Sequence, residues 1–494
     1  MPEQESDLKA QMRKNLETMK SMGFDPYQAY SYERTHTSAG VAKEFADVGQ
    51  EKSDKIVSVA GRVMAKRIHG KAGFADLVDR DGKVQLYFKL NDIGKDLWEL
   101  FLVMDRGDVV GVKGNVFRTK MGEITVAVSE FNVLSKTLTP LPEKFHGLQD
   151  VQMRYRQRYL DLMMNEDVRN RFIKRSRMVV FMRNWLNEKE FIEVETPILQ
   201  PLYGGALARP FVTHHNYLDI DLYLRIAPEL YHKRCIVGNL ESVYEFGKNF
   251  RNEDIDAQHY PEYTSMELYQ AYVDYNAIMD LTESILYDTA MHIAGTEKIP
   301  YGDKVLNFAK PWPRITMTEA IKKYTGFDVS TLKTVDDARD AAVQLGVRDI
   351  EDCHDMGKII SLIFDQKVQP SLIDPVFIID HPVEVSPLAK RKRGAPDLVE
   401  RFELFINGWE LANAFSELND PVEQEHRFRE QDRLKQEGDE EAHPIDSDYV
   451  RALEYGLPPT GGLGVGIDRF AMLVTNAPSI KEVILFPHMK PESA

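Results

Sequence analysis

The stretch Gly461-Gly-Leu-Gly-Val-Gly-Ile-Asp-Arg469 combines a cluster of glycines with a short apolar and charged ending. Its glycines imitate part of the fingerprint of a dinucleotide-binding loop. That fingerprint needs a strand–helix–strand context, which the flanking sequence does not provide. A glycine cluster by itself is therefore a weak indication of function. Its meaning depends on the segments that accompany it along the chain.

Two other segments give this stretch its meaning. One is Phe191-Ile-Glu-Val-Glu-Thr-Pro197, and the other runs from Phe250-Arg-Asn-Glu253 to Tyr263-Thr-Ser-Met-Glu-Leu-Tyr269. In this order and spacing, the three segments resemble motifs 1, 2 and 3 of the class II aminoacyl-tRNA synthetases. The signature residues of those motifs are matched by Pro197, Arg251 and Arg469. The glycines of the third motif would allow a strand and a helix to pack closely beneath a nucleotide, with the helix start favouring phosphate.

Further segments narrow the resemblance to the lysyl-tRNA synthetases, and they cover essentially the whole chain. They are His146-Gly-Leu-Gln-Asp150, Arg154-Tyr-Arg-Gln-Arg-Tyr-Leu-Asp161, Gly204-Gly-Ala-Leu-Ala-Arg-Pro-Phe211, Leu224-Arg-Ile-Ala-Pro-Glu-Leu-Tyr231 and Ser416-Glu-Leu-Asn-Asp420. The resemblance implies lysine–tRNA ligation, in which lysine and ATP give lysyl-adenylate and pyrophosphate before lysine is transferred to the 3′ end of tRNA(Lys).

Composition excludes several other classes of protein. The 494 residues include 62 Lys and Arg against 78 Asp and Glu, a formal charge of −16, with 43% hydrophobic residues. This is the profile of a soluble globular protein of two to four domains. Two distant cysteines, Cys235 and Cys353, exclude a disulfide scaffold and favour a reducing, cytoplasmic location. No apolar run is long enough for a secretory or membrane-spanning segment, so we expect no membrane partner.

The chain changes character at three points, which predicts four regions. They are an N-terminal helical extension (1–50), an OB-fold anticodon-binding domain (51–138), a linker (139–152) and a class II catalytic domain (153–494). Residues 56–135 hold five short β-rich runs separated by turns, which favours a small closed barrel. Beyond the linker, helical periodicity at 168–188 and 276–292 alternates irregularly with extended runs, including 243–250, 264–272, 402–406 and 483–487. The predicted fold class is α+β, an OB-fold β-barrel followed by an antiparallel sheet with flanking helices.

The N-terminal extension carries Leu8, Met12, Leu16 and Met19 at helical spacing. An amphipathic helix that packs on the body explains this pattern, and a partner-binding or RNA-contacting helix is the alternative.

The amino-acid pocket distinguishes lysine from aspartate, because a buried ε-ammonium requires carboxylates and other acceptors at the far end of the site. The resemblance assigns the ε-ammonium to Glu417 and Tyr269, with Glu267 close by, and the aliphatic stem to Phe415. It assigns the α-ammonium to Glu229 and the backbone of Gly205. The α-carboxylate is assigned to Arg251 and Asn413.

The resemblance also assigns the ATP site. Arg251 would clamp the α-phosphate, and Arg469 would meet the γ-phosphate and stack on adenine. These two arginines are the catalytic residues, because positioning and charge neutralisation can drive adenylation without a general base. The other ATP-binding residues are Glu253, His259, Tyr263, Glu403 and Glu410. Glu403 and Glu410 match the family's metal carboxylates, and hard oxygen ligands beside phosphates imply Mg²⁺.

The resemblance assigns the anticodon site of the barrel to Arg67, Phe74, Gln85 and Glu123. Phe74 would stack on a base, and Gln85 would pair with a uracil edge. On the residues alone, Phe74 could equally belong to the barrel core. In the first motif, Pro197 marks the expected homodimer contact, although an ordinary strand-end proline is the alternative.

The second motif departs from the family pattern at Asp254, Gln258 and Tyr260, so its contacts with the acceptor end of tRNA cannot be assigned from sequence. Trp409 is bulkier than expected beside Glu410. Three rivals stay open: an aspartate or asparagine enzyme, a synthetase-derived protein lysylase, and a nucleic-acid-binding module with an inactive synthetase body. The acidic Glu417, the barrel at 56–135, and the intact Arg251 and Arg469 oppose these three rivals in turn.

Overall fold

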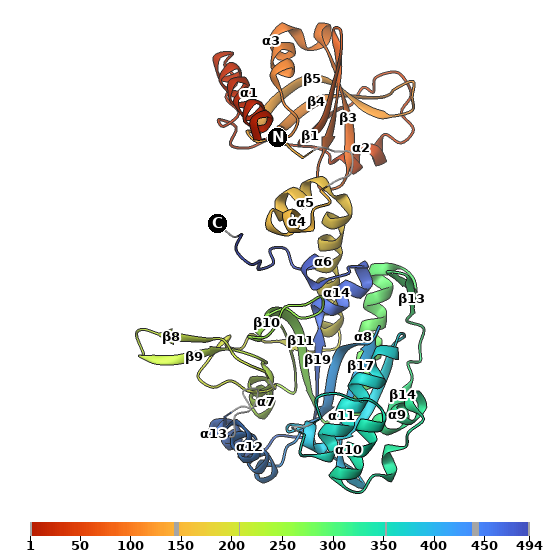
Figure 1. Ribbon diagram of the computed structural model, residues 1–494. Coiled ribbons are helices and arrows are strands. Elements are labelled where there is room, and N and C mark those ends of the chain that lie inside the picture. The colour runs from red at the N-terminus through yellow and green to blue at the C-terminus, as the bar shows by residue number, and fades with distance from the viewer. Residues whose placement is uncertain (1, 143–147, 207, 351–352, 437–443, 493–494) are drawn as a thin grey trace. The chain divides into compact units, whose positions relative to one another are not determined.

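The computed structural model describes residues 2–142, 148–206, 208–350, 353–436 and 444–492. It divides into two compact units, Met1–Gly147 and Leu148–Ala494, which are drawn in Figure 1. No helix among the described residues is long and apolar enough to cross a membrane.

The first unit contains a closed five-stranded barrel in the order β1-β2-β3-β5-β4. Its strands are β1 (Ile56–His69), β2 (Ala72–Val78), β3 (Lys83–Lys89), β4 (Val109–Arg118) and β5 (Ile124–Ser135). All neighbours are antiparallel except β3 and β5, which run parallel. Alternate residues such as Val57, Val59 and Val63 fill the barrel core, as the two-residue period of a strand requires. The predicted barrel is confirmed.

Three helices accompany the barrel: α1 (Pro2–Ser21), α2 (Ser38–Glu44) and α3 (Leu90–Val103). In α1, Met12, Leu16 and Met19 are buried, and Met19 belongs to the barrel core cluster. Leu8 from the same predicted stripe is 54% exposed. Asn15 of α1 donates to Asp105. These contacts favour the packing interpretation of the N-terminal helix.

The predicted linker, 139–152, includes residues 143–147, which lie outside the described residues. Its last two positions already belong to a helix, α4 (Val151–Arg156), which α5 (Arg158–Met164) follows.

The second unit is built on a long sheet in the order β14-β15-β17-β18-β19-β11-β10-β6, with β16 paired to β17. The bounds are β6 (Ile192–Glu193), β10 (Ser242–Phe250), β11 (Glu262–Ala271), β14 (Arg314–Thr316), β15 (Val376–Pro382), β16 (Arg391–Lys392), β17 (Ala395–Ile406), β18 (Trp409–Ser416) and β19 (Thr460–Gly466). Every pair is antiparallel except the two edge pairs, β14 with β15 and β6 with β10. The antiparallel α+β expectation is therefore confirmed.

Helices cover one face of this sheet. They are α6 (Glu166–Asn187), α8 (Tyr275–Ala294) and α14 (Ile467–Thr475), and their apolar side chains join those of the central strands in one core. The first two helices match the predicted helical periodicity. Trp409, unexplained by sequence, packs edge-on against Tyr301 beside this core.

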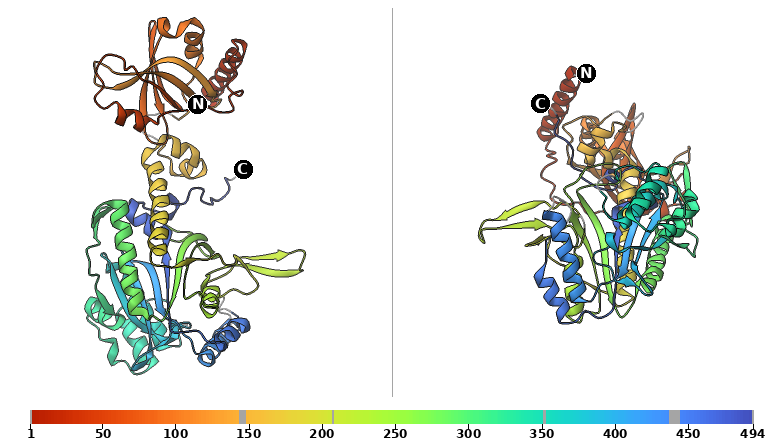
Figure 2. Two further views of the ribbon diagram at one scale, coloured as in Figure 1. Left: turned by 180° about the vertical axis from the view of Figure 1, so that it is seen from behind. Right: turned by 60° about the horizontal axis from the view of Figure 1, so that its bottom comes forward.

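Smaller elements surround the sheet. They are α7 (Glu229–Val237), α9 (Met317–Thr325), α10 (Val335–Gln344), α11 (Met356–Lys367), α12 (Pro421–Gln436) and α13 (Ser447–Glu454), with strands β7 (Leu199–Gln200), β8 (Val212–His215), β9 (Ile220–Leu224), β12 (Lys298–Tyr301) and β13 (Lys304–Asn307). The chain also has short 3-10 turns at Val329–Thr331, Gln369–Ser371, Val383–Val385 and Ile480–Glu482. Strands β8 and β9 project from the second unit as a hairpin (Figures 1 and 2).

The extended run predicted at 483–487 is wrong. The segment follows a 3-10 turn and makes no strand pairing. Its backbone carbonyls at Ile484 and Leu485 accept hydrogen bonds from the buried Arg158 instead. The apolar run reflects the burial of Val483 in the core.

Candidate active site and barrel surface

Strand register decides which side chains meet on the face of the long sheet that the core helices leave free. One row across neighbouring strands runs Glu403–Asn413–Gly464–Glu267, and the next runs Arg401–Phe415–Gly462–Tyr269. Residues two apart on a strand point to the same face, so both rows share it. Predicted site residues from three strands are thereby assembled side by side.

The glycines of β19 create the space between these side chains. A Cβ atom on Gly462 would lie 2.0 Å from Oε1 of Glu417 and 2.6 Å from the Tyr269 ring. Any larger residue would therefore fill the room that the flanking strands enclose. Gly461 points to the other face, where a Cβ would lie 2.4 Å from Ile278 of α8. The predicted close packing of strand and helix thus holds for Gly461, whereas Gly462 opens a cavity.

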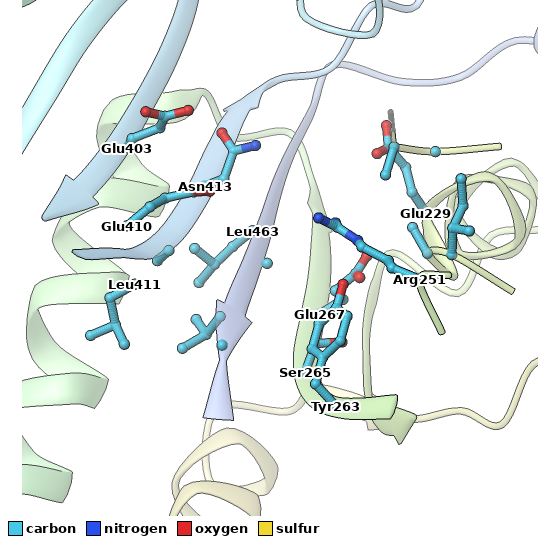
Figure 3. Close-up of a pocket in the computed structure, with 18 of the residues that line it drawn as sticks. Glu229, Arg251, Tyr263, Ser265, Glu267, Glu403, Glu410, Leu411, Asn413 and Leu463 are labelled. Atoms are coloured by element: carbon cyan, nitrogen blue, oxygen red, sulfur yellow. The ribbon is translucent and has the colours of Figure 1, made fainter. Parts of the chain in front are cut away.

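This cavity has a volume of about 460 Å³, within the range of small-molecule sites. Its lining includes every residue that the sequence assigns to lysine, ATP or metal: Gly205, Glu229, Arg251, Glu253, His259, Tyr263, Glu267, Tyr269, Glu403, Glu410, Asn413, Phe415, Glu417 and Arg469. Figure 3 shows Glu403, Glu410 and Asn413 on one side of the cavity and Glu229, Arg251 and Glu267 on the other. Asp254, Gln258 and Tyr260 of the unusual loop also line it.

Three of the carboxyl groups that line the cavity are buried. Glu229, Glu267 and Glu417 are each less than a tenth exposed. Burial, followed by the charge of Glu229, raises the pKa of Glu267 to about 8. Burial also raises the pKa values of Glu229 and Glu417. Because burial disfavours the ionised form of each carboxyl group, a cationic ligand that pairs with the carboxylates would be favoured here.

Two arginines also line the cavity, and Arg251 lies on the same side of it as Glu229 and Glu267 (Figure 3). The pKa of Arg251 is raised above its usual value, chiefly by the Tyr263 side chain. The Nε atom of Arg251 is buried and has no hydrogen-bond partner among the described residues. Arg469 donates through Nη1 to the backbone carbonyl of Glu410 at 2.6 Å. Both guanidinium groups keep further N–H donors, which suit the oxygens of a carboxylate or phosphate.

A metal ion fits beside Glu403 and Glu410. Burial and then the charge of Glu403 raise the pKa of Glu410, so a cation between the two carboxylates would relieve their repulsion. Their hard oxygens match Mg²⁺. No group of three or more His, Cys, Asp or Glu side chains that could hold a metal is found among the described residues. A metal here would therefore share its coordination with ligand oxygens.

Two contacts hold His259 and Tyr260 in the second-motif loop. The Nδ1 atom of His259 lies 2.7 Å from the carboxylate of Asp256 in the same loop, and the His259 side chain is 55% exposed. The hydroxyl of Tyr260 accepts from the backbone N–H of His488, and the two rings stack. The loop is therefore anchored both within itself and to the segment around His488.

Sequence reasoning missed four residues that organise the cavity. Arg401 donates to Asn413 at 3.0 Å and to Glu403 at 2.5 Å. Asp468 accepts from the backbone N–H of Thr264 and from Arg175. Asn249 donates to Glu267 at 3.4 Å. Lys233 lies between two of the acidic residues. Asp468 belongs to a quoted motif, so its position in the sequence was a signal; the other three had none.

The predicted barrel residues share one outer surface of the first unit. Arg67 faces Phe74 on the neighbouring strand, and Phe74 faces Tyr87 on the next. The rings of Phe74 and Tyr87 are 5.0 Å apart, and Phe117 continues the aromatic row at 5.9 Å from Tyr87. Phe74 is half-buried and lies outside the barrel core cluster. This arrangement favours stacking over a purely structural role.

Gln85 and Glu123 meet on the same surface. Gln85 is buried, donates to Glu123 at 2.7 Å and accepts from Thr125 at 3.0 Å. A base edge that binds Gln85 must therefore exchange with these partners. Lys66, one of the cations near Phe74, donates to the carbonyls of Phe101, Leu102 and Met104. It fixes the end of α3 and does not belong to this surface.

Comparison with known proteins assigns each of the two units to a family. A family model described as class II tRNA synthetases (D, K and N) matches residues 150–490, and an OB-fold nucleic-acid-binding model matches 57–134. These matches confirm the predicted pair of folds. A lysine–tRNA ligase of Carboxydothermus hydrogenoformans is 54% identical over 96% of both chains. One from Moorella thermoacetica is 52% identical over 99% of both. A third, from Clostridium novyi, is 51% identical over 98% of this chain and 94% of its own. The chain therefore belongs to the class II tRNA synthetases and, within them, to the lysine–tRNA ligase family.

Proposed function

We propose that the chain is a lysine–tRNA ligase. It activates lysine with ATP and transfers the lysyl group to tRNA(Lys). The observation that carries this proposal is one cavity that combines three buried carboxylates with Arg251 and Arg469. The carboxylates suit the two ammonium groups of lysine, and the arginines suit its carboxylate and the phosphates of ATP. An aspartate side chain would meet like charges at Glu417, so the cavity opposes the aspartate rival.

In the first step, an oxygen of the lysine carboxylate attacks the α-phosphorus of ATP. The bond from that phosphorus to the bridging oxygen breaks, and pyrophosphate leaves. Arg251 holds the attacking carboxylate and the α-phosphate together and neutralises the charge that develops there. Arg469 takes the γ-phosphate. The step needs positioning and charge stabilisation from these residues, with no proton to be removed by a base.

The amino acid is held at both ends. Glu229 and the backbone of Gly205 take the α-ammonium, while Asn413 joins Arg251 at the carboxylate. Phe415 packs against the methylene stem. Glu417, Tyr269 and Glu267 receive the ε-ammonium. The burial of these three side chains supports them as its ligands. Glu253, His259 and Tyr263 contribute to the adenine and phosphate site, which their place in the lining supports.

A divalent metal accompanies ATP, and we propose that it is Mg²⁺ held by Glu403 and Glu410. It would neutralise phosphate charge. Arg401, which donates to Glu403 and Asn413, keeps these side chains in place.

In the second step, the terminal hydroxyl of tRNA attacks the carbonyl carbon of the adenylate, and AMP leaves. The barrel surface of Arg67, Phe74, Gln85 and Glu123 would read the anticodon, supported by the aromatic row and the amide on one face. These substrates are consistent with a cytoplasmic enzyme.

We also propose a homodimer built around the first motif. Near Pro197, the side chains of Ile192, Ile198, Leu199 and Leu202 are each at least 39% exposed. Val212 and Ile220 of the projecting hairpin add to this apolar surface. Such a concentration of exposed aliphatic side chains is typical of a surface that another protein covers.

The test is ATP–pyrophosphate exchange with a panel of amino acids, followed by charging of tRNA. We expect exchange with lysine and not with aspartate or asparagine. Charging of tRNA(Lys) excludes a protein lysylase. Absence of exchange with every amino acid would contradict the proposal and favour an inactive synthetase body.

A further inference from the structure

A buried lysine of the protein itself lies beside two of the carboxylates that line the cavity. Lys233 is fully buried and extends from α7. Its Nζ atom donates to Oε1 of Glu229 at 2.5 Å and forms an ion pair with Oε2 of Glu417. Burial acts to lower the pKa of Lys233, but the charges of Glu229 and Glu417 outweigh it and raise the pKa. The side chain is therefore a fixed ammonium ion.

Lys233 uses only one oxygen of each carboxylate. The second oxygen of Glu417, Oε1, is buried and lacks a hydrogen-bond partner among the described residues. It points toward Gly462, where a Cβ would lie 2.0 Å away. The second oxygen of Glu229, Oε2, lies on the side of Gly205. Oε1 of Glu417 and Oε2 of Glu229 are thus the two oxygens that Lys233 does not use, and both carboxylates are held by the same ammonium.

The charges at this end also balance only when Lys233 is included. Three carboxylates, those of Glu229, Glu267 and Glu417, face one ammonium. When Glu267 is ionised as well, the cluster carries two net negative charges, which equals the two ammonium groups of a lysine substrate. Without Lys233, one carboxylate would stay uncompensated in a buried site, which is costly.

We propose that Lys233 is a positioning residue that sets the spacing between the carboxylate reading the α-ammonium and the carboxylate reading the ε-ammonium, and so selects diamino acids by length. This inference rests on the proposed lysine activation and extends it. Lys233 does not touch the substrate in this account. It acts through Glu229 and Glu417, whose oxygens not used by Lys233 form the two fixed points of the site.

The test measures ATP–pyrophosphate exchange with lysine and with ornithine, which is one methylene shorter. Lys233→Met removes the charge but keeps the length of the side chain. The KM for lysine should rise at least about 30-fold, as expected when one member of a buried charge pair is lost. The KM for ATP should stay within about twofold, because Arg251 and Arg469 are unchanged.

Lys233→Arg keeps the positive charge but replaces a point charge with a larger planar fork. It should move the two carboxylates apart while preserving the fold. The preference for lysine over ornithine should then fall at least about tenfold, since one methylene is typically worth about 10- to 200-fold in selection. This variant decides the matter if Lys233→Met fails to fold.

Lys136→Met is the matched control, because Lys136 is a fully buried lysine between Asp105 and Asp108 in the other unit. It should lower the Tm without changing the KM for lysine or the selectivity. If the Lys233 variants behave in the same way, or raise the KM values for lysine and ATP equally, the positioning role is wrong. If the wild-type protein shows no lysine-dependent ATP–pyrophosphate exchange, the proposed function is wrong instead.

Discussion

The guanidinium carbon of Arg251 lies 5.4 Å from the centre of the Tyr263 ring. The two residues come from the two sides of the second-motif loop, so the contact holds the arginine at the entrance of strand β11. The buried Nε–H of Arg251 still lacks a partner among the described residues. The guanidinium is therefore oriented by the aromatic ring and left with a donor for a ligand.

Arg251→Ala should slow adenylate formation at least ~10²-fold, because the guanidinium faces charge that develops on the α-phosphate. Single-turnover formation of lysyl-adenylate measures this rate. Arg251→Lys keeps the positive charge but loses the planar guanidinium, so its rate of adenylate formation should lie between those of the wild type and Arg251→Ala. An unchanged single-turnover rate with only a raised KM would show that Arg251 binds the ground state alone.

Glu417→Gln should weaken lysine binding by about 3–5 kcal/mol, because a desolvated ammonium loses its countercharge. The KM for ATP should change much less. Glu245→Gln is a suitable control: Glu245 is equally buried, but its carboxylate is used by Arg225, His232 and Thr196. A lysine KM within about threefold of wild type in Glu417→Gln would exclude it as the ε-ammonium ligand.

The pH dependence of lysine activation should report Glu267. Its pKa is raised to about 8, mainly by burial, so the carboxylate is largely protonated at pH 7 and becomes ionised as the pH rises. Because the ionised form attracts the ε-ammonium, kcat/KM for lysine should increase as the pH rises through about 8 and level about one pH unit above that. Glu267→Gln should remove this rise. A profile unchanged by the substitution would assign the titration elsewhere.

Ionisation of Glu267 should favour lysine activation but should lower the stability of the fold. A carboxyl group whose pKa is higher in the folded state than in the unfolded state contributes its full stability below its ordinary pKa of 4.5. That contribution is lost as the pH rises toward about 8. Glu267→Gln should therefore raise the Tm relative to wild type at pH 8 more than at pH 5, as measured by thermal unfolding at both values. An equal difference at the two pH values would contradict the raised pKa.

Phe74→Ala should separate tRNA charging from amino-acid activation. Loss of one stacking ring is worth roughly 1–3 kcal/mol, so kcat/KM for tRNA should fall about 5- to 150-fold. Lysine-dependent exchange should stay within about twofold. Phe88→Ala serves as the control, since Phe88 stacks on Phe101 in the barrel core and should mainly lower the Tm. The same thermal loss in Phe74→Ala, without selective loss of charging, would make Phe74 a core residue.

Leu199→Glu should shift the protein from dimer to monomer, because a charge would enter the apolar surface near Pro197. Sedimentation velocity at several concentrations measures the change. Val343→Glu, on the exposed surface of α10, is the control and should leave the mass unchanged. A wild-type protein that sediments as a monomer at micromolar concentration would contradict the proposed interface.

The sequence by itself determined the fold class and the composition of the cavity. The three motif segments and the short β-rich runs between 56 and 135 predict a barrel and an antiparallel catalytic sheet, and both are present. All of the predicted lysine, ATP and metal residues line one cavity. These residues were assigned through the resemblance to the lysyl-tRNA synthetases, and the assignment succeeded because proteins of one fold bring the same sequence positions to the same site.

Only the tertiary structure decided how those residues are held. Strand register across β17, β18, β19 and β11 brings Arg401 beside Asn413 and leaves Gly462 opposite Phe415 and Tyr269. No local pattern encodes such pairings, because they join residues far apart in the chain. Lys233 looks like one more residue of a short helix until folding buries it between Glu229 and Glu417. Burial removes water from these charges, and that loss of solvent turns an ordinary lysine into a fixed part of the site.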